Sequence, residues 1–464
     1  MRLRDLVASG ILASGLVLAT AAQANPGDPL TPAIAVTTVS GEDIAYATLA
    51  GNPAGQFVVA WPSVPGFNGG WQPGAVYSAQ SFDGTGHVYS APFPIIHDLA
   101  FSPVLAADSA GGFAVTWDSN SAAGRYGAVV QRFTLTGAPL IPETVVSNLD
   151  DDLSLIINSS RIPPTAYPFL GAGCSTSDVG TSPKGGFVVT WACGFDAVYR
   201  INPPQIFSST IAVQRAFLPN GSALGPESMP STDVLAVLDP LLPRPGPIQS
   251  ALTAVAPNGS FMTAWSDSTY SPITIHVRRF NLLGLPLGLP AEIVPNAVPF
   301  DNHGFTGDGL VGIALGTPNN GGQVGNYVLA WYAPIPGVNS QVEGAFTVQG
   351  FDSSNHPLGA AVSLPTPIYA YPQPQRAMAA DAQGNFVIVS YDGQQLTAQF
   401  FKANGTARAG VITLPVDVTS TTFGFQVASD AAGNITVAWE RYHTSTNPQT
   451  LHTDIFVQRF AGMP

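Results

Sequence analysis

The sequence is poor in cysteine and in charge. Only two of its 464 residues are cysteine, and charged residues make up 10% of the chain, whereas about 25% is usual for a soluble protein. Uncharged polar residues, glycine and proline must therefore cover most of the surface. Lys and Arg number 16 against 29 Asp and Glu, which gives a formal net charge of −13. This negative charge repels phosphate backbones, so we expect no nucleic acid partner.

Long hydrophobic runs are also missing after the first 24 residues. No later run approaches the roughly 18 apolar residues that a membrane-spanning helix needs, so we expect no transmembrane segment. Residues 1–24 combine the basic Arg2 and Arg4, an apolar stretch, and the small-residue site Ala22-Gln23-Ala24. This pattern predicts a cleaved secretory signal peptide and a mature domain of residues 25–464. We therefore expect a secreted or periplasmic protein.

The two cysteines, Cys174 and Cys193, are predicted to form a disulfide. In an exported protein, two cysteines most simply pair with each other. Both lie at the same distance from the centre of the turn Ser182-Pro183-Lys184-Gly185. In a symmetric hairpin they face each other, close enough for a bond. A metal-binding or catalytic role for these thiols is the alternative.

A repeated unit organises the rest of the chain. Its clearest copy spans Val104 to Val146 and reads as four short strands with apolar residues at alternate positions, separated by Gly-containing turns. An aromatic in the second strand recurs at Trp61, Trp117, Trp191, Trp265, Trp331 and Trp439, with Ser390-Tyr391 in the sixth copy. Seven four-stranded units that cannot bury both faces alone predict an all-β fold, a seven-bladed β-propeller. A β-helix is the alternative, but its repeats are shorter and more regular.

The two ends of the chain are predicted to share the last blade. The seventh copy stops at Phe460 to Pro464, after its third strand. The segment Gly27 to Val36 aligns with Gly137 to Val146, which forms the fourth strand of the second copy. We therefore expect the N-terminal strand to complete blade seven and close the ring, which removes the open sheet edge.

The predicted topology separates two faces of the propeller. The turns between first and second strands and between third and fourth strands are short, and we call their face the lower face. The other connections lie on the upper face and vary strongly in length, for example Asn148 to Gly173 and Arg441 to Thr453. Variable loops on a regular scaffold favour ligand binding at the upper face.

No specific catalytic motif occurs in the sequence. It contains no G-x-S-x-G, no H-E-x-x-H and no P-loop pattern. Turns such as Asp430-Ala431-Ala432-Gly433 offer only one carboxylate, whereas a calcium loop needs several. We expect each such Asp to cap its own turn, with Gly in the left-handed conformation. We also expect no cofactor.

Polar and aromatic residues of the predicted upper face are the candidate site residues. Carboxylates and histidines from different loops can form a catalytic pair or a metal site where they converge, and aromatic rings can stack on sugar faces. For each residue, a solvated surface or loop packing is the alternative role. The candidate ligand contacts are Trp71, Asp118, Tyr126, Asp267, Tyr270, Asp301, His303, Tyr332, Glu440, Tyr442 and His443. The candidate cation ligands are Asp150, Asp151 and Asp152.

The repeat resembles one found in exported bacterial β-propeller repeat proteins of unassigned role. That pattern reads D-x-x-G-N-F-V-V-x-W, then A-Q-R-F, then G-x-P-x-G, and all seven copies fit it to some degree. The seventh copy, Asp430 to Trp439 followed by Val457-Gln458-Arg459-Phe460, is among the nearest to it. The resemblance implies an exported propeller and carries over no catalytic residues.

These observations favour an exported, monomeric, non-enzymatic propeller that binds a carbohydrate or a protein partner through its upper loops. One alternative is an extracellular or periplasmic hydrolase or lyase with its site at the top of the propeller axis. This alternative rests only on analogy with other propellers. Another is a structural or adhesive surface component. Convergent carboxylates or histidines in a central upper pocket would favour the enzyme.

Overall fold

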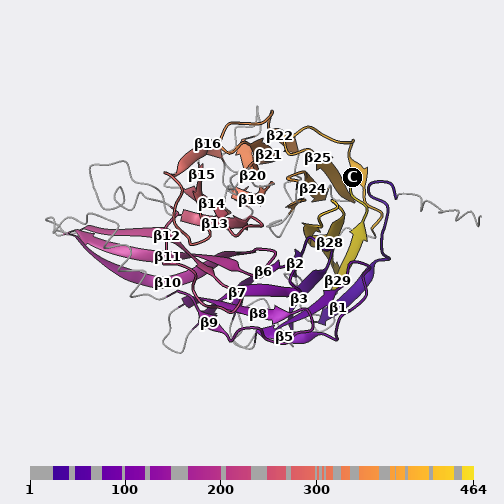
Figure 1. Ribbon diagram of the computed structural model, residues 1–464, viewed down its shortest axis with the longest axis horizontal. Coiled ribbons are helices and arrows are strands. Elements are labelled where there is room, and N and C mark those ends of the chain that lie inside the picture. The colour runs from indigo at the N-terminus through magenta and orange to yellow at the C-terminus, as the bar shows by residue number, and fades with distance from the viewer. Residues whose placement is uncertain are drawn as a thin grey trace, which may run out of the picture.

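The computed structural model describes residues 24–40, 47–63, 76–96, 100–120, 126–147, 166–199, 205–230, 248–267, 273–297, 300–301, 306–307, 310–316, 325–334, 344–364, 377–381, 383–391, 395–416, 422–443 and 452–463. These residues form strands and turns, with no helix among them. Among them there is accordingly no helix of the length and apolarity that crossing a membrane requires. The strands form seven blades around a central axis (Figure 1). The predicted signal peptide lies outside the described residues, apart from Ala24.

The first three blades follow the chain from the inside of the ring outward. Blade one contains β2 (Thr48–Gly51), β3 (Phe57–Ser63), β4 (Val76–Phe82) and β5 (Phe93–Ile96). Blade two contains β6 (Ala100–Ala107), β7 (Gly112–Asn120), β8 (Tyr126–Thr134) and β9 (Thr144–Val145). Blade three contains β10 (Ala166–Thr181), β11 (Phe187–Tyr199) and β12 (Gln205–Phe217), and the bridge from Gln214 to Ser228 marks its fourth position. The long strands of blade three project beyond the ring in Figure 1.

The remaining blades repeat this order. Blade four contains β13 (Ile248–Val255), β14 (Phe261–Asp267), β15 (Ile273–Phe280) and β16 (Ala291–Ala297), and the short pair β17 (Phe300–Asp301) and β18 (Thr306–Gly307) follows it. Blade five contains β19 (Leu310–Leu315), β20 (Tyr327–Pro334), β21 (Gly344–Phe351) and β22 (Val362–Leu364). Blade six contains β23 (Met378–Ala380), β24 (Phe386–Tyr391), β25 (Leu396–Phe401) and β26 (Ile412–Thr413). Blade seven contains β27 (Thr422–Ser429), β28 (Ile435–His443), β29 (His452–Phe460) and, as its outermost strand, β1 (Ile34–Ser40).

Stacked aromatic rings fix the register within six of the blades. The first aromatic of the second strand stacks on the last aromatic of the third strand, with ring centroids 4.8–5.5 Å apart. In blade three this pair is Phe187 with Phe217, so Arg215 lies level with Gln131 of blade two. Arg215, and not the neighbouring Gln214, therefore holds in blade three the position that Gln131 holds in blade two.

The hydrophobic core lies between the blades. Trp439 of blade seven packs with Val387 and Val389 of blade six, while Ala438, on the opposite face of the same strand, packs with Phe57 and Val59 of blade one. Alternate residues of a strand thus serve two different neighbours. The innermost strands contact one another in order around the axis, and β2 meets β27 to complete the circle.

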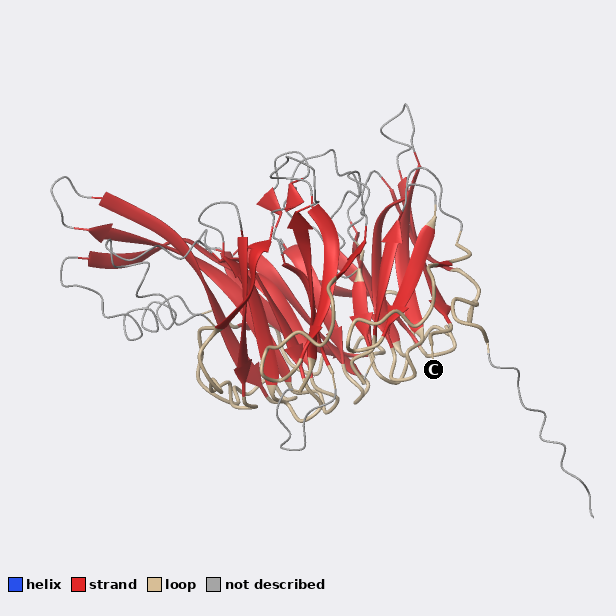
Figure 2. Ribbon diagram, turned by 90° about the horizontal axis from the view of Figure 1, so that it is seen from above, coloured by secondary structure: helices blue, strands red, loops and turns tan. Residues whose placement is uncertain are grey.

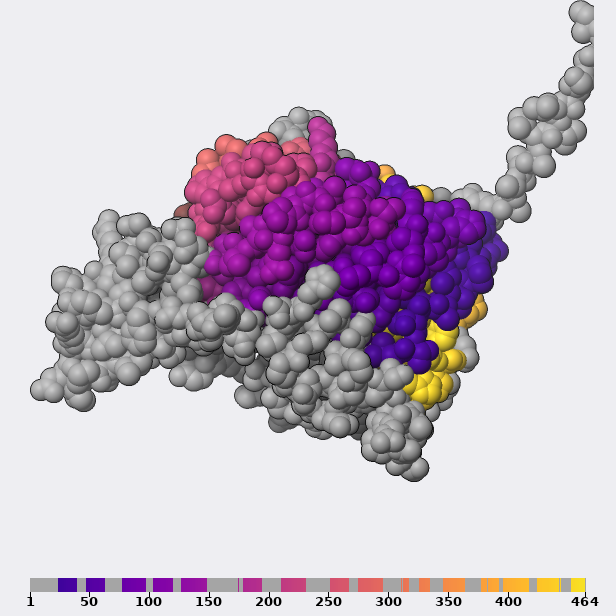
Figure 3. Space-filling view, turned by 90° about the horizontal axis from the view of Figure 1, so that it is seen from below, coloured from indigo at the N-terminus to yellow at the C-terminus, as the bar shows by residue number. Residues whose placement is uncertain are grey.

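The N-terminal strand closes the ring as predicted. β1 pairs antiparallel with β29, and Pro29 bridges to Phe460 as Pro139 bridges to Phe133 in blade two. Ile34, Val36 and Val39 of β1 join the core between blades seven and one. In Figure 3 the yellow C-terminal segment accordingly lies beside the indigo N-terminal one.

Buried arginines tie neighbouring blades together at the lower face. Arg132 forms an ion pair with Asp108 of its own blade and donates to the Pro219 carbonyl of blade three at 2.6 Å. Arg459 does the same across the closing seam: it pairs with Asp430 at 2.5 Å and donates to the Gly84 carbonyl of blade one. In each case, one guanidinium satisfies a buried carboxylate and a carbonyl of the next blade.

The Asp of the repeated turn has the structural role predicted for it. Asp430 Oδ1 accepts hydrogen bonds from the amides of Ala432 and Asn434, both at 2.9 Å, and Gly433 has φ 80°. Asp108 caps its own turn in the same way, with Gly111 at φ 87°. The turns that the structure describes gather on one face of the propeller, as Figure 2 shows.

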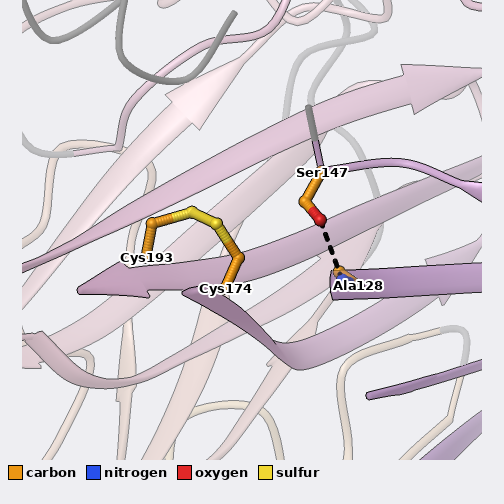
Figure 4. The surroundings of a disulfide bond; sticks show 4 residues. All are labelled: Ala128, Ser147, Cys174 and Cys193. Atoms are coloured by element: carbon orange, nitrogen blue, oxygen red, sulfur yellow. Dashed lines mark hydrogen bonds between the residues drawn. A yellow bond between two sulfur atoms is a disulfide. The ribbon is translucent and has the colours of Figure 1, made fainter. Parts of the chain in front are cut away.

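The disulfide between Cys174 and Cys193 is confirmed (Figure 4). The two residues face each other in the β10–β11 hairpin, with Cα atoms 4.1 Å apart. Ser182 and Gly186 close the turn, so its centre lies half a residue later than the sequence suggested. A register shift between Thr176 and Asp178 compensates and brings the cysteines opposite each other.

Removing residues 25–40 is predicted to destabilise the fold strongly. The change exposes the backbone edge of β29 and removes three side chains from the core between blades seven and one. We expect the melting temperature of the shortened chain to fall by at least about 10 °C. Adding the peptide of residues 25–40 should restore it, and an unchanged melting temperature without the peptide contradicts this closure.

Replacing Arg459 by alanine is predicted to cost about 3–5 kcal/mol of unfolding free energy, because the Asp430 carboxylate remains buried without its cation. Urea unfolding measures this cost. Lys402→Ala removes the same charge from an exposed position of a lower-face turn and should cost less than about 0.5 kcal/mol. Equal costs for the two variants would show that the loss of a positive charge causes the destabilisation, and not the loss of the contacts of Arg459 with Asp430 and Gly84.

Candidate functional site

Several predicted site residues lie outside the described residues: Trp71, Tyr270, His303, Asp150, Asp151 and Asp152. Four others are placed in strands by their backbone. Tyr126 begins β8, Asp267 ends β14, Asp301 ends β17, and Tyr442 pairs with Thr453 near the end of β28. Their side chains lie outside the described part of the structure.

Three predicted contacts are buried in strands instead of lying in loops. Tyr332 is 3% exposed, and its ring meets the edge of Phe346 at 6.0 Å between centroids. Burial raises the pKa of the Tyr332 hydroxyl. Glu440 accepts a hydrogen bond from the Ala47 amide of blade one at 2.6 Å, and Asp118 is buried within β7. The strands continue past the second-strand tryptophan, so these side chains pack within and between blades.

His443 is the predicted residue that the structure places in a polar cluster. Its imidazole Nε2 lies 2.8 Å from Asp454 Oδ2, and its ring stacks on His452 with centroids 4.2 Å apart. Arg441 Nη2 donates to the same oxygen of Asp454 at 3.1 Å, and Thr38 Oγ1 donates to Oδ1 at 2.7 Å. We call Thr38, Arg441, His443, His452 and Asp454 the blade-seven cluster.

Three neighbouring strands bring the blade-seven cluster together. Asp454 of β29 lies between Thr38 of β1 and Arg441 of β28, and His452 faces His443 one pleat further along. Residues two apart on a strand share a face, so this row continues the stack of Trp439 on Phe456. The Arg441 guanidinium lies 4.7 Å from the centroid of Phe456. The aromatic pair thus supports the polar groups from below.

The cluster lies at the upper end of blade seven, beyond the position that matches the last residue of β24. In the repeat, Ser390 of β24 corresponds to Trp439, so Tyr391, the last residue of β24, corresponds to Glu440. β28 continues for three more residues to His443, roughly 10 Å at the usual rise of a strand. Trp439 packs against blade six, so Arg441 and His443 lie on the same face of β28, beyond the position level with Tyr391. The side chains remain partly exposed there, His443 by 39% and Asp454 by 17%.

Asp454 is held as an anion. Burial opposes its ionisation, but hydrogen bonds from Thr38, His443 and Arg441 outweigh this effect, so the pKa of the Asp454 carboxyl lies below its ordinary value. The anion fixes the guanidinium and one imidazole in place. The cluster therefore offers donors and acceptors of set direction, and two imidazoles beside a carboxylate form a set that can hold a metal ion.

The sequence did contain a pattern from which the positions of Asp454, His452 and Arg441 beside one another could have been predicted. His443 and His452 flank one upper-face connection at equal distances from its centre, as Arg441 and Asp454 do. The same symmetry argument that located the disulfide applies to this hairpin. Thr38 had no such signal, because its contact with Asp454 depends on the closing strand and spans 416 residues.

Neither the protein-family models nor the curated proteins contain a match to this sequence. Solved structures do resemble it in fold. A hydrazine synthase of Kuenenia stuttgartiensis is 10% identical, with a TM-score of 0.43 over 92% of this chain and 96% of the other. An ulvan lyase, described as a new family of polysaccharide lyase, is 8% identical, with a TM-score of 0.44 over 94% and 95%. The hemagglutinin-neuraminidase ectodomain of parainfluenza virus 5 is 7% identical, with a TM-score of 0.41 over 93% and 82%.

Replacing Asp454 by asparagine is predicted to destabilise the protein at neutral pH but not in acid. A carboxyl whose pKa is lowered on folding stabilises the fold above its unfolded pKa, and this contribution disappears as the pH falls through the folded pKa. We expect Asp454→Asn to cost about 1 kcal/mol at pH 7 and almost nothing near pH 2. Urea unfolding at both pH values measures the difference. The exposed Glu143→Gln is the control, and a cost for Asp454→Asn that is the same at both pH values would contradict the prediction.

Proposed function

We propose that this protein is an exported, non-enzymatic propeller that binds a carbohydrate through the upper ends of its blades. The observation that carries the proposal is the partly exposed blade-seven cluster on the upper ends of β28 and β29. Its residues do not belong to the repeat, whereas the lower-face Asp and Arg residues are repeated and engaged in holding the blades together. Side chains that the scaffold does not require are available for recognition.

The chemistry of the cluster suits hydroxyl groups. A guanidinium, two imidazoles and a carboxylate supply both donors and acceptors at fixed positions. Sugars present adjacent hydroxyls that donate and accept at once. The net charge of −13 disfavours polyanions and so supports a neutral glycan as the partner.

The state of Asp454 supports binding over catalysis. A general acid or base works best when its pKa lies near the operating pH. The Asp454 carboxyl instead has a lowered pKa and is engaged by three donors. As a permanent anion, it orients Arg441 and His443 without exchanging a proton with a substrate.

A hydrolase or lyase is the second candidate, and the contact of His443 with Asp454 favours it. A carboxylate 2.8 Å from an imidazole nitrogen holds the ring in a fixed orientation, as in many enzymes that use histidine as a base. In that case His443 is the base, and Asp454 positions it. Turnover of a polysaccharide that depends on His443 would identify this function.

Export is part of the proposal. Residues 1–24 have the pattern of a signal peptide. The disulfide between Cys174 and Cys193 fits an oxidising compartment such as the periplasm or the cell exterior.

A glycan array probed with the purified chain tests the carbohydrate proposal. We expect selective binding to neutral glycans, at least about tenfold weaker in His443→Ala, which corresponds to the loss of one good polar contact. His356→Ala is the matched control, because His356 pairs with Asp352 in an exposed lower-face turn. A blank array, or equal loss in both variants, contradicts the proposal. Release of new reducing or unsaturated ends from a bound glycan would instead support the enzyme.

A further inference from the structure

We propose that His443, His452 and Asp454 bind one divalent transition-metal ion of the zinc class. Two imidazoles and a carboxylate are ligands that Zn²⁺ prefers, and three protein ligands leave one position for water or a ligand oxygen. One ligand atom from each residue lies within 4.8 Å of the other two. This is the one group of three or more potential ligands that is found in the described part of the chain.

Small rotations of the side chains are enough to complete the site. Ligand atoms on one Zn²⁺ ion lie roughly 3–3.5 Å apart, given bond lengths of about 2.0–2.2 Å. His443 and Asp454 are already 2.8 Å apart, so the main movement is that of the His452 ring out of its stack on His443. Both histidines are partly exposed, which gives this ring room to turn.

The neighbours of Asp454 support the role of its carboxylate as a ligand. Thr38 donates to Oδ1, so Oδ2 is the oxygen that faces the histidine. Groups that hold a metal-binding carboxylate in this way typically improve affinity by about ten- to a hundredfold. Arg441 also donates to Oδ2, and its positive charge opposes a cation. We therefore expect weaker binding than at a closed structural zinc site.

Metal binding at this position couples to ring closure. The ion would join β28 to β29, and the hydrogen bond between Thr38 and Asp454 extends this link to β1. A ligand that binds only the folded state raises its stability. Zinc should therefore raise the melting temperature of the protein, and the closing strand should contribute to zinc affinity.

Isothermal titration of the EDTA-treated, dialysed chain with Zn²⁺ tests the proposal. We expect one ion per chain, with affinity reduced tenfold or more in His443→Ala and in His452→Ala. His356→Ala should bind as the wild type does. Thr38→Val, which keeps the shape of the side chain but removes the donor, should weaken binding by about tenfold.

A second measurement tests the proposal even if one of the alanine variants fails to fold. Co²⁺ in a four-coordinate site absorbs visible light, so the wild type should show this absorption and Zn²⁺ should abolish it. The conservative His452→Gln, which can still stack and donate, should fold and lack the band. Absence of zinc binding by the wild type, or equal binding by the wild type and both histidine variants, would overturn the proposal.

The inference does not depend on the proposed carbohydrate function. Zinc titration uses no glycan, so a blank glycan array leaves the expected zinc result unchanged. Zinc binding without glycan binding would support the metal site alone, and glycan binding unaffected by EDTA, with no zinc bound, would overturn the metal site alone.

Discussion

Every blade of this protein depends on its two neighbours to bury its faces. A four-stranded sheet has two apolar faces, and here Trp439 and Ala438 of one strand pack against different blades. No blade can therefore be removed or left open without exposing a core. Closing the ring is the constraint that the rest of the structure must meet, and β1 meets it by completing the last blade and joining the core between that blade and blade one.

This constraint explains the distribution of charge. With few charged residues, the chain places buried ion pairs where they join blades: Arg132 with Asp108, and Arg459 with Asp430 at the closing seam. Each guanidinium also donates to a carbonyl of the next blade, so the pair specifies which surfaces meet. The charged residues of the lower face thereby hold the blades together, whereas the strand ends of the upper face differ in length from blade to blade.

The blade-seven cluster arises from one such difference. Blade six has Ser390 in place of the tryptophan, and β24 ends at Tyr391, whereas β28 runs on to His443 among the described residues. Polar side chains occupy this end, and Thr38 of the closing strand is one of them. The candidate site and the closure of the ring thus share a hydrogen bond.

The sequence by itself determined the blades, the closing strand and the disulfide, because alternating apolar residues and turn glycines act locally and symmetry within a hairpin needs only counting. It did not predict that Tyr332 and Glu440 are buried, because strand length beyond the tryptophan depends on neighbouring blades. Nor did it predict the register shift between Thr176 and Asp178. Only the tertiary structure placed Thr38 beside Asp454, since that contact requires the two ends of the chain to meet.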